Sequence, residues 1–225
     1  MRFYTTADGL ARDDVHCVVQ VKDGPIWFGT SEGASRFDGS SFRTFRVSDG
    51  LPGRDVHRIL LTRDGGVWAA TSGGLARLRR ATDPKANLFT QVPISGLPAG
   101  AGVDRVLQDA HGAIWVGSYA GLYRLQPTRT GEFNSQRIDL RLESGASLFG
   151  QIFPGTPDPH QPVFALLEDH QGNIWIGTSA GLYCSRPDGH IVLFSEKKRI
   201  AWLCRPCTPR RRRSQTVGGH HAGTR

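Results

Sequence analysis

The sequence has 225 residues, of which 38% are hydrophobic and 21% charged. This composition excludes a disordered polyelectrolyte and suits one folded domain or two small ones. The net charge of +8 belongs to one end: nine Lys and Arg stand from Lys197 onward without an acid, whereas residues 1–196 carry 19 basic and 20 acidic side chains. We therefore expect affinity for polyanions only in this basic tail.

Targeting and redox signals are weak. No apolar signal-peptide core follows Met1, and no run approaches the ~18 to 20 apolar residues of a membrane span. We expect neither an export signal nor a membrane segment in this chain, and its localisation stays open. Four cysteines are too few for a disulfide framework, and Cys17 and Cys184 are expected to be buried thiols.

An internal repeat occurs four times along the chain. Its copies read "GPIWFGTSEGASRF" from Gly24, "GGVWAATSGGLARL" from Gly65, "GAIWVGSYAGLYRL" from Gly112 and "GNIWIGTSAGLYCS" from Gly172. The four tryptophans are Trp27, Trp68, Trp115 and Trp175, spaced 41, 47 and 60 residues apart. Repeats of about 40 to 45 residues are typical of propeller blades, each of which buries its faces only against a neighbour.

The elements of each copy are expected to be short strands. Twelve residues before the four tryptophans stand Val15, Val56, Val103 and Val163, each opening an apolar run. A turn at Gly, a strand through Trp, a second turn at Gly and a last strand follow. We predict an all-β fold: a partial β-propeller of about four four-stranded blades in an open arc, spanning residues 1–196, with a disordered basic tail at 197–225.

Two features modify the regular pattern. The turns "DGLARDDVH" from Asp8 and "DGLPGRDVH" from Asp49 precede the first two copies, and the third keeps "GLP" at Gly96. The wider spacing before Trp175 predicts an insertion at about residues 126–161. Its segment "LRLESGASLFGQIF" is compatible with either an extra hairpin or an elaborated loop.

The pattern D-x-x-G-x-I-W-x-G-T-x-x-G-L-x-R resembles the two-component regulator propeller repeat. The copies around Trp115 and Trp175 match closely and include Asp109 and Asp169 upstream, whereas the first two copies shift this residue to Asp23 and Asp64. The second copy also has two alanines where an apolar residue and Gly are usual. Four copies in register extend the resemblance over residues 3 to about 196.

The resemblance implies a sensory role. Similar repeats form extracytoplasmic propellers of hybrid two-component sensor histidine kinases, which often respond to carbohydrate breakdown products. We thus expect a noncatalytic, ligand-binding part of such a sensor, whose parent region is periplasmic or extracytoplasmic and whose kinase and membrane parts are not in this sequence. The expected partners are a small ligand, with carbohydrate as a candidate, and the remaining blades of the parent sensor.

The basic tail departs from the repeat. A further Trp is expected 41 to 47 residues after Trp175, but Val217 stands 42 residues after it. A slip of one nucleotide near the codons of Lys197 and Lys198 would make residues 217–220 compatible with Trp-Val-Gly-Thr, although Ser214 does not supply the expected Gly. We interpret residues 197–225 as a fifth blade read out of frame, a truncation by frameshift, and keep a genuine tail as the alternative.

The tail also carries a zinc-like pattern. Cys204 and Cys207 have suitable spacing, but His220 and His221 are adjacent where a zinc finger needs ~3 to 5 residues between its histidines. We therefore expect no metal site. Its four consecutive arginines would bind polyanions without specificity, so we expect no specific nucleic-acid partner, and nucleic-acid binding through the tail ranks as the weakest alternative function.

Candidate ligand-binding residues come from one repeat position. His16 and His57 follow the Val of the first two copies, and Asp104 and Phe164 hold this position in the later copies. Inner strands of propellers start near the axis, so His16, His57 and Asp104 are expected near a polar funnel mouth. Two exposed loop histidines copied by duplication are the alternative. The repeated Trp is expected to pack between blades instead of forming a sugar platform.

No catalytic motif was found. The sequence has no nucleophile elbow, phosphate loop or metal-ligand cluster, so we expect no enzyme activity, no catalytic residue and no cofactor. An alternative is a propeller-fold lyase or hydrolase, similar to the lyases that open cyclic antibiotics. This class needs a His and a carboxylate near the axis with a metal, and His111, His160, His170 and His190 share no repeat position.

Overall fold

The computed structural model describes residues 3–79, 88–140, 162–179 and 181–194. The strands are β1 (Val15–Gln20), β2 (Ile26–Thr30), β3 (Gly33–Phe37), β4 (Phe42–Phe45), β5 (Val56–Leu61), β6 (Val67–Thr71), β7 (Gly74–Arg79), β8 (Leu88–Gln91), β9 (Val103–Gln108), β10 (Ile114–Ser118), β11 (Gly121–Pro127), β12 (Phe133–Ile138), β13 (Val163–Glu168), β14 (Ile174–Thr178), β15 (Gly181–Ser185) and β16 (Ile191–Phe194). Two 3-10 turns, η1 (Thr6–Asp8) and η2 (Val47–Asp49), precede the first two groups of four.

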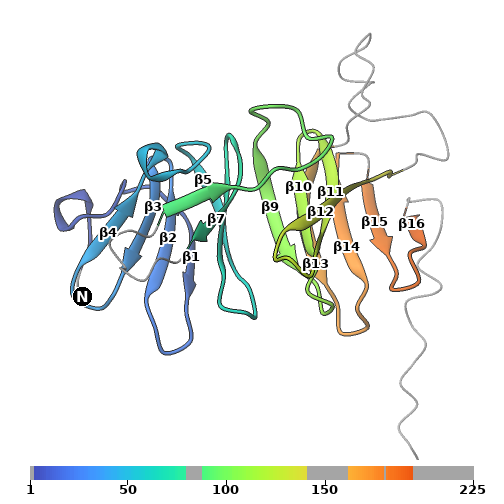
Figure 1. Ribbon diagram of the computed structural model, residues 1–225, viewed down its shortest axis with the longest axis horizontal. Coiled ribbons are helices and arrows are strands. Elements are labelled where there is room, and N and C mark those ends of the chain that lie inside the picture. Colours follow the sequence, from blue (N-terminus) through green and yellow to red (C-terminus); the bar gives the residue numbers. More distant parts are fainter. Residues whose placement is uncertain (1–2, 80–87, 141–161, 180, 195–225) are drawn as a thin grey trace, which may run out of the picture. The chain divides into compact units, whose positions relative to one another are not determined.

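The strands form four antiparallel sheets of four consecutive strands each, which we call the first to fourth blades (Figure 1). Each blade runs in simple order from an inner strand, and the inner strands β1, β5, β9 and β13 contact one another in sequence. The all-β class, the four four-stranded blades and the open, propeller-like arc are therefore confirmed. The predictions for residues 197–225 lie outside the described residues.

The predicted insertion is only partly described. Strand β11 extends to Pro127, and β12 (Phe133–Ile138) pairs with it as the outer strand of the third blade. Residues 133–138 thus belong to the regular blade instead of to an elaborated loop. The segment suggested as an extra hairpin lies outside the described residues, apart from Leu140.

The repeated tryptophans pack between blades. Trp27 stacks on Phe45 of its own blade and meets the edge of Phe89 from the second blade. Trp68 meets Phe133 of the third blade in the same way, and Trp115 belongs to a buried cluster with Ile176 of the fourth. The prediction of packing between blades is confirmed at these three interfaces, where the tryptophans are at most 4% exposed. Truncation of such a side chain to Ala typically costs about 3–5 kcal/mol.

The glycine two residues after Trp has a packing reason. A Cβ on Gly29 would lie 2.7 Å from the carbonyl oxygen of Val56, and a Cβ on Gly117 would lie 2.7 Å from Val163 Cγ1. Both valines open the inner strand of the next blade. The Gly therefore lets neighbouring blades approach closely, while Ala70 takes this position in the second blade.

The Asp of the repeat fixes both a turn and the Trp. Asp109 is 3% exposed; one carboxylate oxygen accepts from the amides of His111 and Ala113, and the other accepts from the Trp115 indole at 2.8 Å. Asp169 repeats this arrangement with Trp175 at 2.8 Å. Burial raises the pKa of Asp169, but hydrogen bonds from Asn173 and Trp175 outweigh it and lower the pKa to about 2.

The second blade lacks this contact. In the second blade Thr62 occupies the position of Asp109, and Asp64 lies two residues later, where it accepts from Thr62 and Gly66. The buried Trp68 indole nitrogen has no hydrogen-bond partner in the described part of the chain. Shifting the Asp by two residues therefore keeps the turn but leaves the indole N–H unpaired, at a cost of roughly 1–3 kcal/mol.

The D-G-L turns lead into the first two blades. Asp8 accepts from the backbone N–H of Thr5 at 2.8 Å, and Asp49 accepts from Arg46 at 2.9 Å. Gly9 follows with φ of 105°, a conformation that suits Gly. Leu10 and Leu51 are then buried, which anchors each turn to its blade. This explains why the same three residues recur before the two inner strands.

Two smaller expectations concern cysteines and membranes. Cys17 and Cys184 are free and buried, as expected, and burial raises the pKa of both thiols. None of the helices in the described ranges has the length and apolar character that crossing a bilayer requires.

Candidate functional site

The predicted site residues stand at β-bulges. In every blade the pairing of the inner strand with the next strand shifts by one residue, so one residue of the inner strand has no partner opposite it. The four bulge residues are His16, His57, Asp104 and Phe164. Bulges redirect side chains and are frequent next to binding sites. The repeat position picked from the sequence is therefore a structural position, and both histidines lie in strands, not in loops.

Three bulge residues and two further carboxylates form a cluster that crosses three blades. His16 Nδ1 lies 3.0 Å from Asp55 Oδ1, and His57 Nε2 lies 3.5 Å from Asp55 Oδ2. His57 Nδ1 lies 3.2 Å from Asp104 Oδ1, which extends the contacts to the third blade. We call Asp14, His16, Asp55, His57 and Asp104 the histidine–aspartate cluster.

The proton on His57 can be assigned from its partners. Nδ1 lies 3.0 Å from the carbonyl oxygen of Val103, which can only accept, so Nδ1 donates. Because Nε2 faces Asp55, the doubly protonated ring suits both of its neighbours. The hydrogen bond with Asp104 raises the pKa of His57 against the opposing effect of burial, and the Val103 carbonyl and the Asp55 charge add to it.

Asp14 and Asp55 are the members that sequence reasoning missed. Each stands two residues before a histidine, in "DVH". Asp14 lies 3.7 Å from His16, and its pKa is lowered first by the hydroxyl of Ser31, which donates to it at 2.8 Å. The repeated "DVH" was the available signal, because it places a carboxylate two residues before each histidine, just ahead of an inner strand. The bridging of two blades by Asp55 depends on blade packing, which local spacing does not encode.

In the fourth blade the bulge position carries an aromatic residue. Phe164 is 45% exposed and lies edge-on to Tyr119, which is 62% exposed, at 6.3 Å between ring centroids. Tyr119 follows β10, in the turn that corresponds to Ser31 of the first blade. The same end of the inner strands therefore carries a charged cluster on three blades and two exposed rings at the interface of the third and fourth.

The cluster suits recognition by hydrogen bonds. Its side chains range from 17% exposed for Asp104 to 52% for Asp14. They present carboxylate acceptors at the same end of the inner strands as two aromatic rings, a combination that binds hydroxyl groups and the apolar face of a ring. Within the described ranges, no three His, Cys, Asp or Glu side chains are grouped so that they could hold a metal ion.

Comparison with known proteins identifies the repeat. Residues 157–180, which include Trp175, match the family described as "Two component regulator propeller". No curated protein matches the sequence significantly.

Solved structures share the fold. The extracellular domain of the hybrid two component system BT3049 from B. thetaiotaomicron is 20% identical, with a TM-score of 0.60 over 84% of this chain and 24% of that chain. PorZ, a surface component of the type-IX secretion system of Porphyromonas gingivalis, is 16% identical, with a TM-score of 0.62 over 88% and 30%. Virginiamycin B lyase from Staphylococcus aureus, in its catalytically inactive H270A form, is 14% identical, with a TM-score of 0.55 over 80% and 55%.

These matches cover only part of each similar protein. This chain spans about a quarter of the length of the BT3049 extracellular domain. Identities of 20% or less show a common fold, and both sensor domains and a lyase occur among the similar structures. The chain therefore carries a two component regulator propeller repeat on a propeller fold that it shares with extracellular domains of two component systems.

Proposed function

We propose that this chain is the noncatalytic, ligand-binding part of a two-component sensor, and that its ligand binds over the histidine–aspartate cluster. The observation that carries the proposal is the placement of His16, His57 and Asp104 at equivalent bulges. Asp55 links His16 to His57, and His57 contacts Asp104, so that three blades are joined. A ligand over this cluster would contact several blades at once. Its binding energy would then stabilise one relative arrangement of the blades, which a sensor needs in order to transmit a signal.

The proposed ligand is a small polyhydroxylated molecule, with carbohydrate as the leading class. Each hydroxyl group can donate to a carboxylate oxygen of Asp14, Asp55 or Asp104. The exposed rings of Phe164 and Tyr119 would pack against an apolar ring face. The similar BT3049 structure is an extracellular domain, and we propose an extracytoplasmic location for the corresponding region of the parent sensor, whose remaining blades would complete the propeller.

A thermal-shift screen tests this function. The 225-residue protein would be melted with a panel of neutral mono- and disaccharides and uronic acids, beside the variants Asp104→Asn and Phe164→Ala. We expect at least one compound to raise the Tm of the wild type by roughly 2 °C or more, consistent with ligand well above its Kd. Both variants should lose most of this rise. A panel without any stabilising compound, or a rise that both variants keep, would contradict the proposal.

A lyase remains the second candidate because a His and a carboxylate do converge, at His57 and Asp104. A lyase of this kind would consume its ligand, whereas a sensor would release it unchanged. Incubating the protein with quinupristin and Mg²⁺, followed by mass spectrometry, separates the two. Turnover that the variant His57→Gln abolishes would favour the lyase over the sensor.

A further inference from the structure

A second cavity lies between the second and third blades, apart from the histidine–aspartate cluster. Its volume is about 670 Å³, which is within the ~300–1,000 Å³ of small-molecule sites. We call it the interblade groove; its lining includes Asp64, Arg77, Thr90, Gln91 and Val92 of the second blade and Phe133 of the third. Asp64 follows the end of β5, whereas His57 lies at the start of that strand, so the two sites are at opposite ends of it.

The second blade lacks a ring that the first and fourth blades place beside the Trp. In the first blade Phe45 stacks on Trp27 at 5.4 Å, and in the fourth Phe194 lies tilted against Trp175 at 5.2 Å, whereas the third blade has Ile138 at this place. Both phenylalanines stand opposite the residue seven after Trp. In the second blade this place belongs to Val92, whose amide donates to the Leu75 carbonyl. A small side chain thus replaces a phenyl ring beside Trp68.

A second position of this blade also carries a smaller side chain than its counterpart in the first blade. Arg43 pairs with Arg36 in the first blade and lies over the Phe45 ring at 4.6 Å. The equivalent residue of the second blade is Thr90, which pairs with Arg77. At both positions the second blade therefore has a smaller side chain than the first blade.

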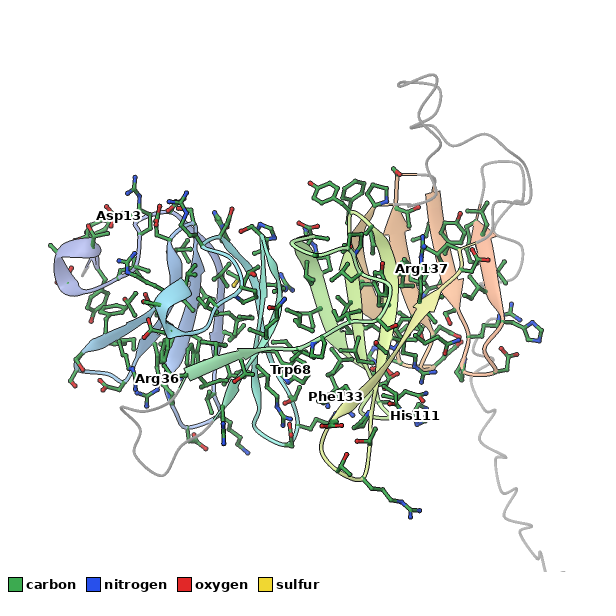
Figure 2. All side chains as sticks on the ribbon, turned by 45° about the horizontal axis from the view of Figure 1, so that its top comes forward. Asp13, Arg36, Trp68, His111, Phe133 and Arg137 are labelled. Atoms are coloured by element: carbon green, nitrogen blue, oxygen red, sulfur yellow. The ribbon has the colours of Figure 1, made fainter. Side chains whose placement is uncertain are left out.

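The walls of the groove are flat and held in place. The Arg77 guanidinium lies 5.4 Å from the Trp68 ring and 5.7 Å from the Phe133 ring, and Asp64 holds it at 3.0 Å. Phe133 meets Trp68 edge-on at 4.9 Å (Figure 2). A guanidinium plane beside a phenyl ring is a surface that favours a flat aromatic partner.

The polar groups of the lining restrict the charge and the polar groups of the ligand. Two arginines are balanced by Asp64 and Glu132, so the lining has no net charge that would favour an ionic ligand. Thr90 and Gln91 provide hydroxyl and amide groups at the edge. A hydroxyl group on the ligand can pair with any of these side chains.

We propose that the interblade groove binds a neutral aromatic ring that carries a hydroxyl group, beside Val92, the residue that takes the place of Phe45 of the first blade. The ring stacks over the Arg77 guanidinium beside Phe133, and the hydroxyl meets the polar edge at Thr90 and Gln91. This site is independent of the histidine–aspartate cluster and of the ligand proposed for it.

The probe is p-cresol, observed by NMR on the ¹⁵N-labelled 225-residue protein. We expect the amide signals around Arg77, Thr90 and Phe133 to shift with a Kd on the order of 1 mM, as suits so small a ligand. The variant Val92→Phe supplies the ring from the protein itself and should weaken binding at least tenfold while its Tm stays at or above that of the wild type. Val47→Phe adds the same ring at an exposed site and should bind like the wild type.

A second compound tests whether the ligand must be aromatic. 4-Methylcyclohexanol has a similar size but lacks the flat ring, and it should bind several-fold more weakly than p-cresol. The proposal is overturned if p-cresol shifts none of these signals, if Val92→Phe binds it as tightly as the wild type, or if the saturated ring binds equally well. None of these outcomes depends on whether a ligand is found for the histidine–aspartate cluster.

Discussion

His57 of the second blade lies 3.2 Å from Asp104 of the third, Nδ1 to Oδ1, and both are the bulge residues of their inner strands. The same ring faces Asp55 through Nε2 at 3.5 Å, and Asp55 in turn meets His16 of the first blade. Adjacent blades are thus joined by polar contacts at one end of their inner strands, in addition to the apolar contacts of the tryptophans.

The first prediction concerns pH. Because the folded protein raises the pKa of His57, protonated His57 stabilises the fold below its unfolded pKa, ~6.5, and this stabilisation disappears as pH rises through the higher folded value. The groups that face His57 are Asp55, Asp104 and the Val103 carbonyl. Asp104→Asn should therefore lower the Tm by roughly 2–4 °C at pH 5.5 and by much less at pH 9.

Thermal melts across this pH range check the prediction. His190 lies in the turn between β15 and β16, away from the cluster, so His190→Gln is the matched control and should follow the wild-type curve. A deficit of Asp104→Asn that is constant from pH 5.5 to pH 9 would show that His57 does not supply the difference.

The second prediction concerns Asp109. Replacing it with Ala leaves the Trp115 indole, the His111 and Ala113 amides and the Arg124 guanidinium without their acceptor. We expect a loss of about 3 kcal/mol in the free energy of unfolding, measured with urea. Asp38 also accepts several hydrogen bonds, but in an exposed turn, so Asp38→Ala should cost much less than Asp109→Ala. Equal losses would refute the role of the buried Asp–Trp contact.

The third prediction concerns the fourth blade. Leu182 is 42% exposed and Leu167 62%, whereas Leu75 and Leu122, the counterparts of Leu182, are at most 1% exposed because a further blade covers them. A polypeptide of these 225 residues, produced alone, should therefore self-associate at micromolar concentration. The double variant Leu167→Lys, Leu182→Lys should be mostly monomeric in analytical ultracentrifugation, and it is the background in which the melts and titrations are recorded.

A surface control separates this face from general solubility. Leu88 of the second blade is 47% exposed, so Leu88→Lys adds a charge elsewhere and should leave self-association unchanged. A wild-type protein that is monomeric and melts cooperatively would contradict the prediction.

The fourth prediction concerns the basic tail, residues 197–225, which lie outside the described residues. If they are a fifth blade read out of frame, resequencing of the DNA from the codon of Ser195 onward should reveal one nucleotide lost or gained, after which the repeat continues. A confirmed reading frame would make Cys204, Cys207 and the arginines genuine, and zinc binding would then be measured directly.

Much of the fold could be predicted because it depends on residues that are close together in the sequence. The Trp and Gly residues recur at fixed spacing and the strands are short, so four blades and the packing of Trp27, Trp68 and Trp115 followed from the repeat. Two features could not be predicted: the contacts of Asp55, and Val92 at the place where the first blade has a phenyl ring. The first depends on which residues of neighbouring blades face each other, and the second depends on the register of the last strand within its blade. A shift of one residue in a bulge or register changes either one without a local signature.

The most direct measurement is an NMR titration of the protein labelled with [¹³C]histidine, using the saccharide panel. His111, His170 and His190 lie in turns away from the cluster and serve as internal controls. Ligand binding at the proposed site should shift the ring signals of His16 and His57 and leave those of the three controls in place. A stabilising ligand that shifts only the control histidines, or none of the five, would contradict the placement of the binding site at the histidine–aspartate cluster.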